Sequence, residues 1–511
     1  MSRRRWVARL ALLGGPLLAW LAFHALPADY TNAAGEPAAF TAAGRATLAV
    51  LVWMAVWWLT EAIDVTATAL LPAVLFPLLG IASMNAATAP YANSVIFLFL
   101  GGFLLAMSMQ RWRLDRRIAL LTLRLTGTRP DRMIGGFMLA TACLSAFVSN
   151  TATVAMMLPI AASVIALVAA REGADTASRE RGAFPLALLL GVAYAASIGG
   201  IATIIGTPPN VYLVGFIRDG IAEPFRRDIG FLDWMLIGTP LAVAFLLFAW
   251  VMLTRVLYPV GRIPIQGGSR FLRAAHAELG APSRGEITTL VVFLLTATAW
   301  MIRPWLNTWS LTWGGEIWRP LGGLSDPGIA LLGALALFIL PANAAGERVM
   351  NWRATRDLPW GVLILFGGGL SLAAAVQANG VAEWLGTHTT ALAAWPPWLV
   401  ILLVVAAVVF LTELTSNTAT TATLVPILAA LAPGLGLHPY ALIVPAAIGA
   451  SFAFMMPVAT PPNAIVFGTG HLTIPQMCRA GWWLNIVGIG LIMLVLYALI
   501  VPVLEFSVRV E

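Results

Sequence analysis

The chain has 511 residues, and its composition is that of a membrane protein rather than a soluble one. Hydrophobic residues make up 60% of it and charged residues 10%, whereas soluble domains have roughly 45–50% and 25%. The formal net charge is +7, and all 30 basic residues are arginines that stand between apolar segments. The composition excludes a soluble enzyme, a disordered chain and a nucleic-acid-binding arm, and it predicts an integral membrane protein.

Apolar segments follow one another along the whole chain. They lie at about 10–27, 46–62, 65–82, 94–110, 132–169, 184–217, 234–257, 286–302, 327–341, 358–377, 397–432, 440–470 and 481–505. The arginines that precede the first segment are also typical of a secretory signal, but a retained first span fits a chain with this many later spans. The two cysteines, Cys143 and Cys478, match no disulfide or metal spacing.

Four of these segments do not read as simple membrane-spanning helices. Segments 132–169 and 397–432 are too long for one span, and each carries Ser-Asn-Thr in its middle. We expect each to be a re-entrant hairpin that returns to the side from which it entered. Segments 184–217 and 440–470 are interrupted by Thr-Pro-Pro-Asn. Two consecutive prolines remove two backbone donors and exclude the preceding residue from the α region, so these helices should break there.

The distribution of the arginines supports eleven spans and two hairpins. With the N-terminus inside, 23 arginines fall in inside segments and 7 in outside segments, as the positive-inside rule requires. If segment 132–169 crossed the membrane once, the loop with Arg171, Arg179 and Arg181 would lie outside. The count therefore predicts a protein of the cytoplasmic (inner) membrane with its N-terminus inside and its C-terminus outside. The first hairpin opens to the inside and the second to the outside.

The two halves of the chain contain the same motifs in the same order. Ser149–Thr153 recurs as Ser416–Thr420, and a Gly-Gly pair precedes both. Thr207–Asn210 recurs as Thr460–Asn463. Because an odd number of spans separates corresponding elements, the halves have opposite orientations. Inverted repeats with interrupted helices are typical of secondary transporters, in which the binding site lies near the midplane of the bilayer.

The chain is expected to divide at the ends of these repeats. The predicted parts are a first span and loop (1–45), a first repeat (46–258), a cytoplasmic linker (259–285), a second repeat (286–505) and a C-terminal tail (506–511). In segment 111–124 charged and apolar residues alternate, which indicates either a helix along the inner membrane surface or an ordinary cytoplasmic loop. The fold class is thus an all-α integral membrane protein with an inverted repeat.

The two Ser-Asn-Thr tips and the two Thr-Pro-Pro-Asn breaks are the candidate binding elements. Irregular backbone at membrane depth is tolerated only where it is buried in protein or lines a cavity. Amides at helix N-termini suit a carboxylate, whereas carbonyl and hydroxyl oxygens suit a cation such as Na+. No arginine lies in either hairpin between residues 133 and 170 or 397 and 432. Co-bound cations would then supply the countercharge. The alternative is that these polar residues only pack helices, but both motifs are duplicated in order.

Three acidic residues lie close to apolar segments. Glu61 and Asp64 stand at a span boundary, where a structural role is expected. Glu413 immediately precedes the second tip, and both a functional role and a hydrogen bond to nearby backbone remain open. The five histidines are scattered near segment ends and form no ligand cluster.

Together these motifs resemble those of the divalent anion:sodium symporter (DASS) family, which includes the di- and tricarboxylate transporters. The resemblance covers nearly the whole chain from about residue 46. It depends on Thr60–Ala62, Phe97–Gly102, both Ser-Asn-Thr motifs, Gly206–Asn210 and Ala459–Asn463. Where similar proteins commonly have proline, this chain has Asp64. The resemblance implies a homodimer whose protomers each combine a scaffold domain with a moving transport domain, an elevator mechanism.

The resemblance also implies roles for individual residues. Substrate contacts would come from Asn150, Thr151, Thr207, Asn417, Thr418, Thr460 and Pro461. The first Na+ site would use Ser145, Ser149, Asn150 and the carbonyl of Gly206. The second Na+ site would use Thr412, Asn417 and the carbonyl of Ala459. Ser416 would support the second tip. Polar residues at both cation positions favour a Na+ cotransporter over the Na+-independent exchangers of the family.

The favoured function is Na+-coupled uptake of a C4-dicarboxylate such as succinate, malate or fumarate, with two or more Na+ and no organic cofactor. The expected partners are the dicarboxylate, Na+, membrane lipid and a second copy of the chain, and no nucleic acid. A Na+-independent exchanger and a citrate or sulfate carrier are alternatives on the same fold. An intramembrane hydrolase would need a nucleophile with a base or a metal motif, and an anion channel would need rings of basic side chains. The sequence favours neither.

Overall fold

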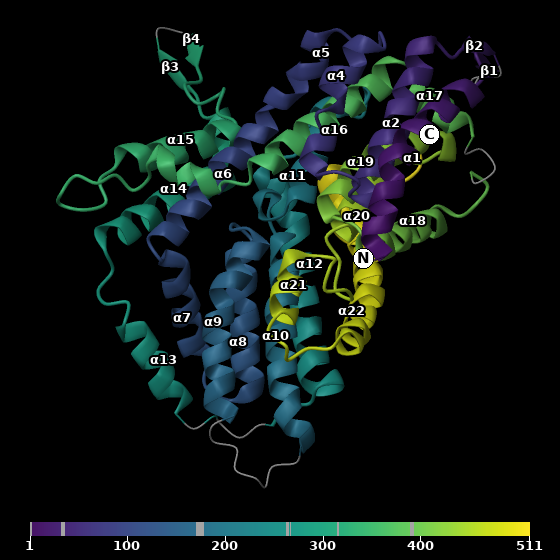
Figure 1. Cartoon of the computed structure of the whole chain (residues 1–511). Helices are drawn as coiled ribbons and strands as arrows, with labels where there is room; N and C mark the ends of the chain where they lie inside the picture. Colours follow the sequence, from purple (N-terminus) through teal and green to yellow (C-terminus); the bar gives the residue numbers. More distant parts are fainter. Residues whose placement is uncertain are drawn as a thin grey trace.

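The computed structural model describes residues 3–31, 36–169, 178–261, 265, 267–313, 316–388 and 393–510, and these are predominantly helical (Figure 1). Within this described part, nine helices are long and apolar enough to cross a membrane, and five further apolar helices are shorter. The prediction of an all-α membrane protein is confirmed at this level. The division into eleven spans and two re-entrant hairpins stays a prediction. The loop with Arg171 lies outside the described residues.

The first half of the chain contains twelve α-helices in the described part, with short 3-10 and π turns between them. They are α1 (Arg3–Ala25), α2 (Ala42–Thr60), α3 (Val65–Thr68), α4 (Leu71–Leu78), α5 (Met84–Thr88), α6 (Ser94–Arg111), α7 (Leu114–Thr126), α8 (Pro130–Ser145), α9 (Asn150–Ala169), α10 (Ser178–Gly200), α11 (Pro208–Gly215) and α12 (Phe231–Val251). Side-chain oxygens of Thr41 and Asn93 cap α2 and α6 by accepting free backbone N–H groups.

The second half contains eleven described α-helices. They are α13 (Gly268–Ala277), α14 (Arg284–Thr308), α15 (Asp326–Ile339), α16 (Trp360–Ala378), α17 (Val381–Thr387), α18 (Pro397–Thr412), α19 (Asn417–Leu431), α20 (Pro439–Gly449), α21 (Pro461–Phe467), α22 (Ile474–Val495) and α23 (Val501–Leu504). Ser283 and Glu286 form a capping box at the start of α14.

Two small antiparallel hairpins accompany the helices, and the all-α prediction did not include them. Strand β1 (Asp29–Thr31) pairs with β2 (Pro37–Ala39), and β3 (Leu311–Trp313) pairs with β4 (Glu316–Trp318). The hairpin formed by β3 and β4 projects from the body of the molecule (Figure 1). Strands of three residues carry too little alternation to be distinguished from loops in a sequence.

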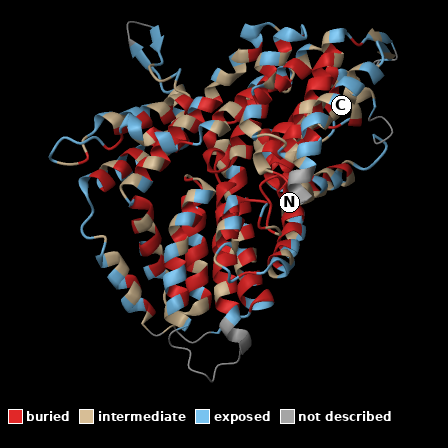
Figure 2. Ribbon diagram, viewed as in Figure 1, coloured by how far each residue is buried: buried red, intermediate tan, exposed pale blue. Residues whose placement is uncertain are grey.

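The most deeply buried helices lie at the centre of the molecule (Figure 2). In an 18-residue apolar stretch of α10, 89% of the residues are buried inside the protein, compared with 17% in such a stretch of α1. Helix α8 packs against α10, and its counterpart α18 packs against α20. Helix α1 instead exposes large apolar side chains, including those of Leu10 and Leu13. In a membrane such a surface is solvated by lipid tails rather than by water.

The two halves of the chain pack against each other where the motifs lie. Helix α10 ends at Gly200 and α11 begins at Pro208, while α20 ends at Gly449 and α21 begins at Pro461. Helix α11 of the first half packs against α19 of the second, and α21 of the second half packs against α9 of the first. Each break therefore meets the tip helix of the opposite half.

The predicted linker (259–285) and the predicted surface helix (111–124) lie next to each other in the structure. The 259–285 stretch contains α13, so part of it is helical rather than extended linker. Helix α7 buries Leu120 and Leu123 and exposes Arg124. Arg117 of α7 forms a buried ion pair with Glu286 of α14, with an Nε to Oε1 distance of 2.7 Å. This pair fixes α7 against the start of the second half.

Candidate functional site

The two Ser-Asn-Thr tips have matching geometry. At the first tip, Ser145 Oγ at the end of α8 donates to Asn150 Oδ1 at the start of α9, at 2.5 Å. At the second tip, Thr412 Oγ1 at the end of α18 donates to Asn417 Oδ1 at the start of α19, at 2.8 Å. Corresponding residues are 267 positions apart in both pairs. Both hydroxyl-bearing residues are completely buried, so each holds its asparagine from behind.

The two Thr-Pro-Pro-Asn breaks also match. Thr207 and Thr460 have extended backbone, with φ of −145° and −139°, and a helix starts again at the proline that follows each of them. Proline is well suited to the first helical position, because its missing N–H would have no partner there. The breaks therefore present carbonyl and hydroxyl oxygens instead of a continuous helix surface.

The final asparagine of each break holds the preceding backbone, a role that the sequence alone did not reveal. Asn210 Nδ2 donates to the carbonyl oxygens of Gly200 and Thr203, and Asn463 Nδ2 donates to those of Ala453 and Met456. The acceptors within each pair lie ten and seven residues before the asparagine, and both asparagines are fully buried. The duplicated Asn was the available signal, but only the structure identifies its partners.

Tips and breaks from both halves surround one cavity of about 830 Å³. It is lined by Glu61, Phe99, Phe103, Ser149, Asn150, Thr151, Ile205, Gly206, Thr207, Pro208, Pro209, Asp357, Pro359, Val362, Ser416, Asn417, Thr418, Val458, Ala459, Thr460, Pro461, Pro462 and Ala464. All seven residues expected to contact substrate line it. Of those expected to bind cations, Ser145 and Thr412 alone do not reach its wall. Ser416 lines it in the same way as Ser149.

Two oxygens of the first tip and break converge beside Gly200. A Cβ atom at this glycine would lie 2.8 Å from Asn150 Oδ1 and 3.1 Å from the carbonyl oxygen of Gly206. A side chain would therefore fill the space between the tip and the break. The amide oxygen, the carbonyl oxygen and the nearby hydroxyl of Ser145 are neutral hard donors, which suit a cation such as Na+.

The charged side chains on the cavity wall are acidic. Among the described residues that line it there is no arginine or histidine, and its charged side chains are those of Glu61 and Asp357. Glu61 ends α2 in a left-handed conformation, with φ of 49°. The sequence predicts a structural role for Glu61, and the structure shows that this residue also lines the cavity. Asp64 caps α3 by accepting the N–H of Thr66 at 2.8 Å.

Glu413 lies behind the second tip and does not line this cavity. Its carboxylate accepts backbone N–H groups of Phe454, Met455 and Met456 and the side-chain amide of Asn485. Of the two alternatives open from the sequence, the structure shows hydrogen bonds to backbone. This backbone immediately precedes the second break, 41 to 43 residues further along the chain than Glu413.

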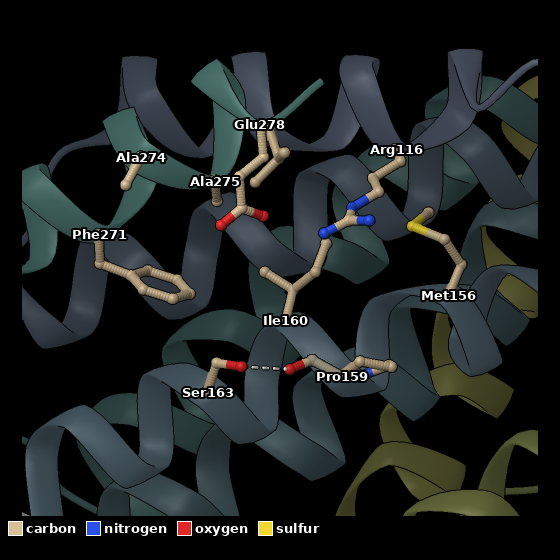
Figure 3. A pocket seen from close by; sticks show the side chains of 10 residues that line it. Arg116, Met156, Pro159, Ile160, Ser163, Phe271, Ala274, Ala275 and Glu278 are labelled. Atoms are coloured by element: carbon tan, nitrogen blue, oxygen red, sulfur yellow. Dashed lines mark hydrogen bonds between the residues drawn. The ribbon is translucent and has the colours of Figure 1, made fainter. Parts of the chain in front are cut away.

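A second cavity, of about 430 Å³, lies between α7, α9 and α13 (Figure 3). Its wall includes Arg116, Ile160, Phe271 and Glu278, and none of the tip or break residues. This cavity lies where α13 packs against α7, and the predicted site residues are not part of it.

The family model described as the sodium:sulfate symporter transmembrane region matches residues 30–504. The chain belongs to this symporter family. The resemblance to the divalent anion:sodium symporters is thereby confirmed, and the chain is a transporter and not an enzyme.

Curated relatives cover most of the chain. The sodium-dependent dicarboxylate transporter SdcS of Staphylococcus saprophyticus is 40% identical over 91% of this chain and 88% of its own length. SdcS of Staphylococcus aureus strain MRSA252 is 39% identical over the same shares.

Solved structures with lower identity share the fold. MtrF of Neisseria gonorrhoeae, described as one of a class of antimetabolite efflux pumps, has a TM-score of 0.63 at 12% identity and covers 97% of this chain and 95% of its own. The YdaH transporter of Alcanivorax borkumensis has a TM-score of 0.57 at 16% identity, over 97% and 99%. At these identities the likeness concerns the fold alone.

Proposed function

We propose that the chain is a secondary active transporter that couples the uptake of a C4-dicarboxylate, such as succinate, malate or fumarate, to the entry of two or more Na+. The cavity formed by the tips and breaks would hold the dicarboxylate and Na+ together. The relatives that are named sodium-dependent dicarboxylate transporters support both the ion and the substrate class.

The absence of basic side chains among the described residues that line the cavity is the observation that carries this proposal. Two acidic side chains and no arginine or histidine line it among the described residues. With no basic side chain among the described wall residues to balance it, a dianion needs co-bound cations as its countercharge. Such a site binds substrate well where Na+ is abundant and releases it where Na+ is scarce, which is the coupling that a symporter needs.

The tips supply the groups that a carboxylate requires. Helices α9 and α19 begin at Asn150 and Asn417, so the first backbone amides of two long helices lie at the cavity. Free amides at a helix N-terminus attract anions. We assign one carboxylate of the substrate to each tip, with Thr207 and Thr460 as further hydrogen-bond donors. The two ends of a dicarboxylate would thus meet the two halves of the inverted repeat.

The roles implied by the family resemblance complete the proposal. The first Na+ would bind Ser145, Ser149, Asn150 and the carbonyl of Gly206. The second would bind Thr412, Asn417 and the carbonyl of Ala459. With eleven spans and two re-entrant hairpins, the N-terminus would lie on the cytoplasmic side of the inner membrane and the C-terminus on the outside. The protein would act as a homodimer with an elevator mechanism. The convergence of oxygens beside Gly200 supports the first ion site.

Sulfate is the second candidate substrate, because the matching family model is described by sodium and sulfate. A Na+-independent exchanger and a citrate carrier are further alternative functions for a protein of this fold. Uptake of radiolabelled succinate into proteoliposomes, with an inward gradient of Na+ or of K+, tests the proposal. We expect uptake with Na+ only, and competition by unlabelled malate and fumarate but not by sulfate. Equal uptake with both cations would refute Na+ coupling, and competition by sulfate alone would refute the dicarboxylate.

A further inference from the structure

The carboxylate of Glu413 binds one short stretch of backbone from both of its oxygens. Oε1 accepts the N–H groups of Phe454 at 2.7 Å and Met455 at 2.9 Å. Oε2 accepts those of Met455 at 3.0 Å and Met456 at 3.1 Å. Asn485 Nδ2 donates to Oε1 at 2.7 Å, and Glu413 is only 3% exposed. A buried carboxylate is tolerated only with such a full set of donors.

This backbone stretch leads directly to the second break. The carbonyl oxygen of Met456 accepts the N–H of Ala459 at 3.2 Å and Asn463 Nδ2 at 3.1 Å. Asn463 in turn donates its backbone N–H to Thr460 Oγ1 at 3.3 Å. Two hydrogen-bonded steps therefore connect the carboxylate of Glu413 to Ala459, whose carbonyl is expected at the second cation site. Three such steps connect it to Thr460, which lines the cavity.

The same residue is joined to the second tip by the chain itself. Glu413 directly follows Thr412, whose single hydroxyl proton is shared between two acceptors, Asn417 Oδ1 and the carbonyl oxygen of Ala450, at 2.8 Å each. A shift of Glu413 therefore moves the groups on the tip side of the site as well as those on the break side.

The first half of the chain uses a neutral connection at the corresponding place. The residue 267 positions before Glu413 is Ala146. Its carbonyl oxygen accepts the hydroxyl of Thr203, and that hydroxyl also accepts the N–H of Gly206 at 3.1 Å. The two halves are thus alike in the tip and break residues that line the cavity, and they differ in the residue behind each tip, Ala146 in the first half and Glu413 in the second.

We propose that Glu413 is a positioning residue that holds the second break against the second tip and so sets the affinity of the second cation site. It does this without touching the substrate. The inference rests on the proposed function, because it assumes that the second tip and break bind Na+.

The variant Glu413→Gln tests this inference in the full-length purified protein. An amide of the same shape keeps one acceptor, but its NH2 group faces backbone N–H groups, so the connection to the break is lost on one side. In proteoliposomes at saturating succinate, we expect the Na+ concentration for half-maximal uptake to rise by about tenfold, which corresponds to about 1.4 kcal/mol of binding free energy. At saturating Na+, the half-saturating succinate concentration should change by less than about twofold.

Two further variants separate positioning from general stability. Glu413→Asp keeps the charge on a shorter side chain, so its Na+ requirement should lie between those of Glu413→Gln and the parent, and it decides the question if Glu413→Gln does not fold. Glu286→Gln removes another buried carboxylate, whose partners are Arg117 and the N–H of Ser283 and which lies away from the cavity. It should lower the unfolding temperature and leave the Na+ requirement unchanged.

The outcomes distinguish failure of this inference from failure of the proposed function. An unchanged Na+ requirement in both Glu413 variants, or one raised equally in Glu286→Gln, would overturn the positioning role. A change in the succinate requirement alone would also overturn it, because Glu413 would then act on the substrate. If the parent protein takes up succinate without Na+, the proposed function fails and this inference fails with it. If the parent requires Na+ and Glu413→Gln matches it, only this inference fails.

Discussion

At the scale of single residues, Asn150 and Asn417 have the most specific positions. Each begins a long helix, lines the cavity and has its amide oxygen held by a buried hydroxyl five residues earlier. The side chain can thus present its oxygen to a cation and its NH2 group to a carboxylate. We interpret each asparagine as the link through which Na+ and substrate stabilise one another.

Substitution of either asparagine should therefore affect both ligands. In Asn150→Ala and Asn417→Ala, the half-saturating concentrations of succinate and of Na+ should rise together, by roughly tenfold for a loss of about 1.4 kcal/mol. In the aspartate variants an oxygen remains for the cation, but like charge faces the substrate, at a cost of about 1–4 kcal/mol at about 4 Å. Aspartate should harm succinate binding more than Na+ binding. Titration calorimetry on folded protein measures both, and parent-like binding in all four variants would make the tips structural.

Gly200 tests the first cation site by steric means alone. A methyl group there would approach Asn150 Oδ1 to 2.8 Å and occupy the space beside the Gly206 carbonyl, whereas Gly182 on the same helix α10 has nothing within 4 Å. Overpacking of this kind costs about 1–3 kcal/mol. Gly200→Ala should raise the Na+ concentration needed for uptake severalfold, and Gly182→Ala should not. Equal Na+ dependence in the two variants would place the first ion elsewhere.

His438 provides a pH-dependent contribution to stability outside the membrane-spanning segments. It caps α20 by accepting the N–H of Tyr440 at Nδ1, at 3.2 Å, and its ring contacts Phe225 and Phe506. Burial lowers the pKa of His438 from 6.5 to about 4. Between these two values the unfolded chain binds more protons than the folded one, so stability falls as pH falls from 6.5 towards 4 and changes no further below it.

The variant His438→Asn isolates this effect, because asparagine can also cap a helix and does not titrate. In detergent, the unfolding temperature should decrease more between pH 7.5 and pH 5 for the parent protein than for the variant. Equal losses would show that other groups cause the acid sensitivity.

At the scale of elements, the decisive feature is the pairing of α8 with α9 and of α18 with α19. The lengths and the central Ser-Asn-Thr motifs predict two re-entrant hairpins that open to opposite sides. Accessibility of single cysteines tests this in a version that lacks Cys143 and Cys478. Gly182 at the mouth of the first hairpin and Ala394 before the second are both exposed. An impermeant thiol reagent should label Gly182→Cys only from the inside and Ala394→Cys only from the outside.

Labelling of both cysteines from one side would contradict the inverted orientation of the two hairpins. A version with both cysteines absent and no replacement should remain unlabelled from either side, which controls for reaction at other groups. The outcome concerns the arrangement of elements and is independent of which substrate is carried.

At the scale of the whole molecule, the motif-based features were the most predictable from sequence. Proline pairs break helices for local reasons, so the breaks before Pro208 and Pro461 could be located without a structure. The duplicated order of motifs then indicated that both halves contribute to one site, and the cavity is lined from both halves.

Features that depend on distant partners could not be predicted in this way. The carboxylate of Glu413 binds backbone 41 to 43 residues away and Asn485, 72 residues away. The acidic lining by Glu61 and Asp357 likewise requires the packing of separate segments. Helix α13 was obscured by the glycines and charged residues around it. Each of these depends on tertiary contacts that no short sequence pattern specifies.

The central claim is that the dicarboxylate and Na+ bind together in the cavity between the two halves. The most direct test is calorimetric titration of succinate into the purified protein at a series of Na+ concentrations, with K+ keeping the ionic strength constant. The account predicts that succinate affinity rises steeply with Na+, that Li+ substitutes poorly, and that K+ alone supports no binding, because no basic side chain among the described residues lines the cavity and the dianion needs co-bound cations. Succinate binding of equal strength in Na+ and in K+ would contradict it.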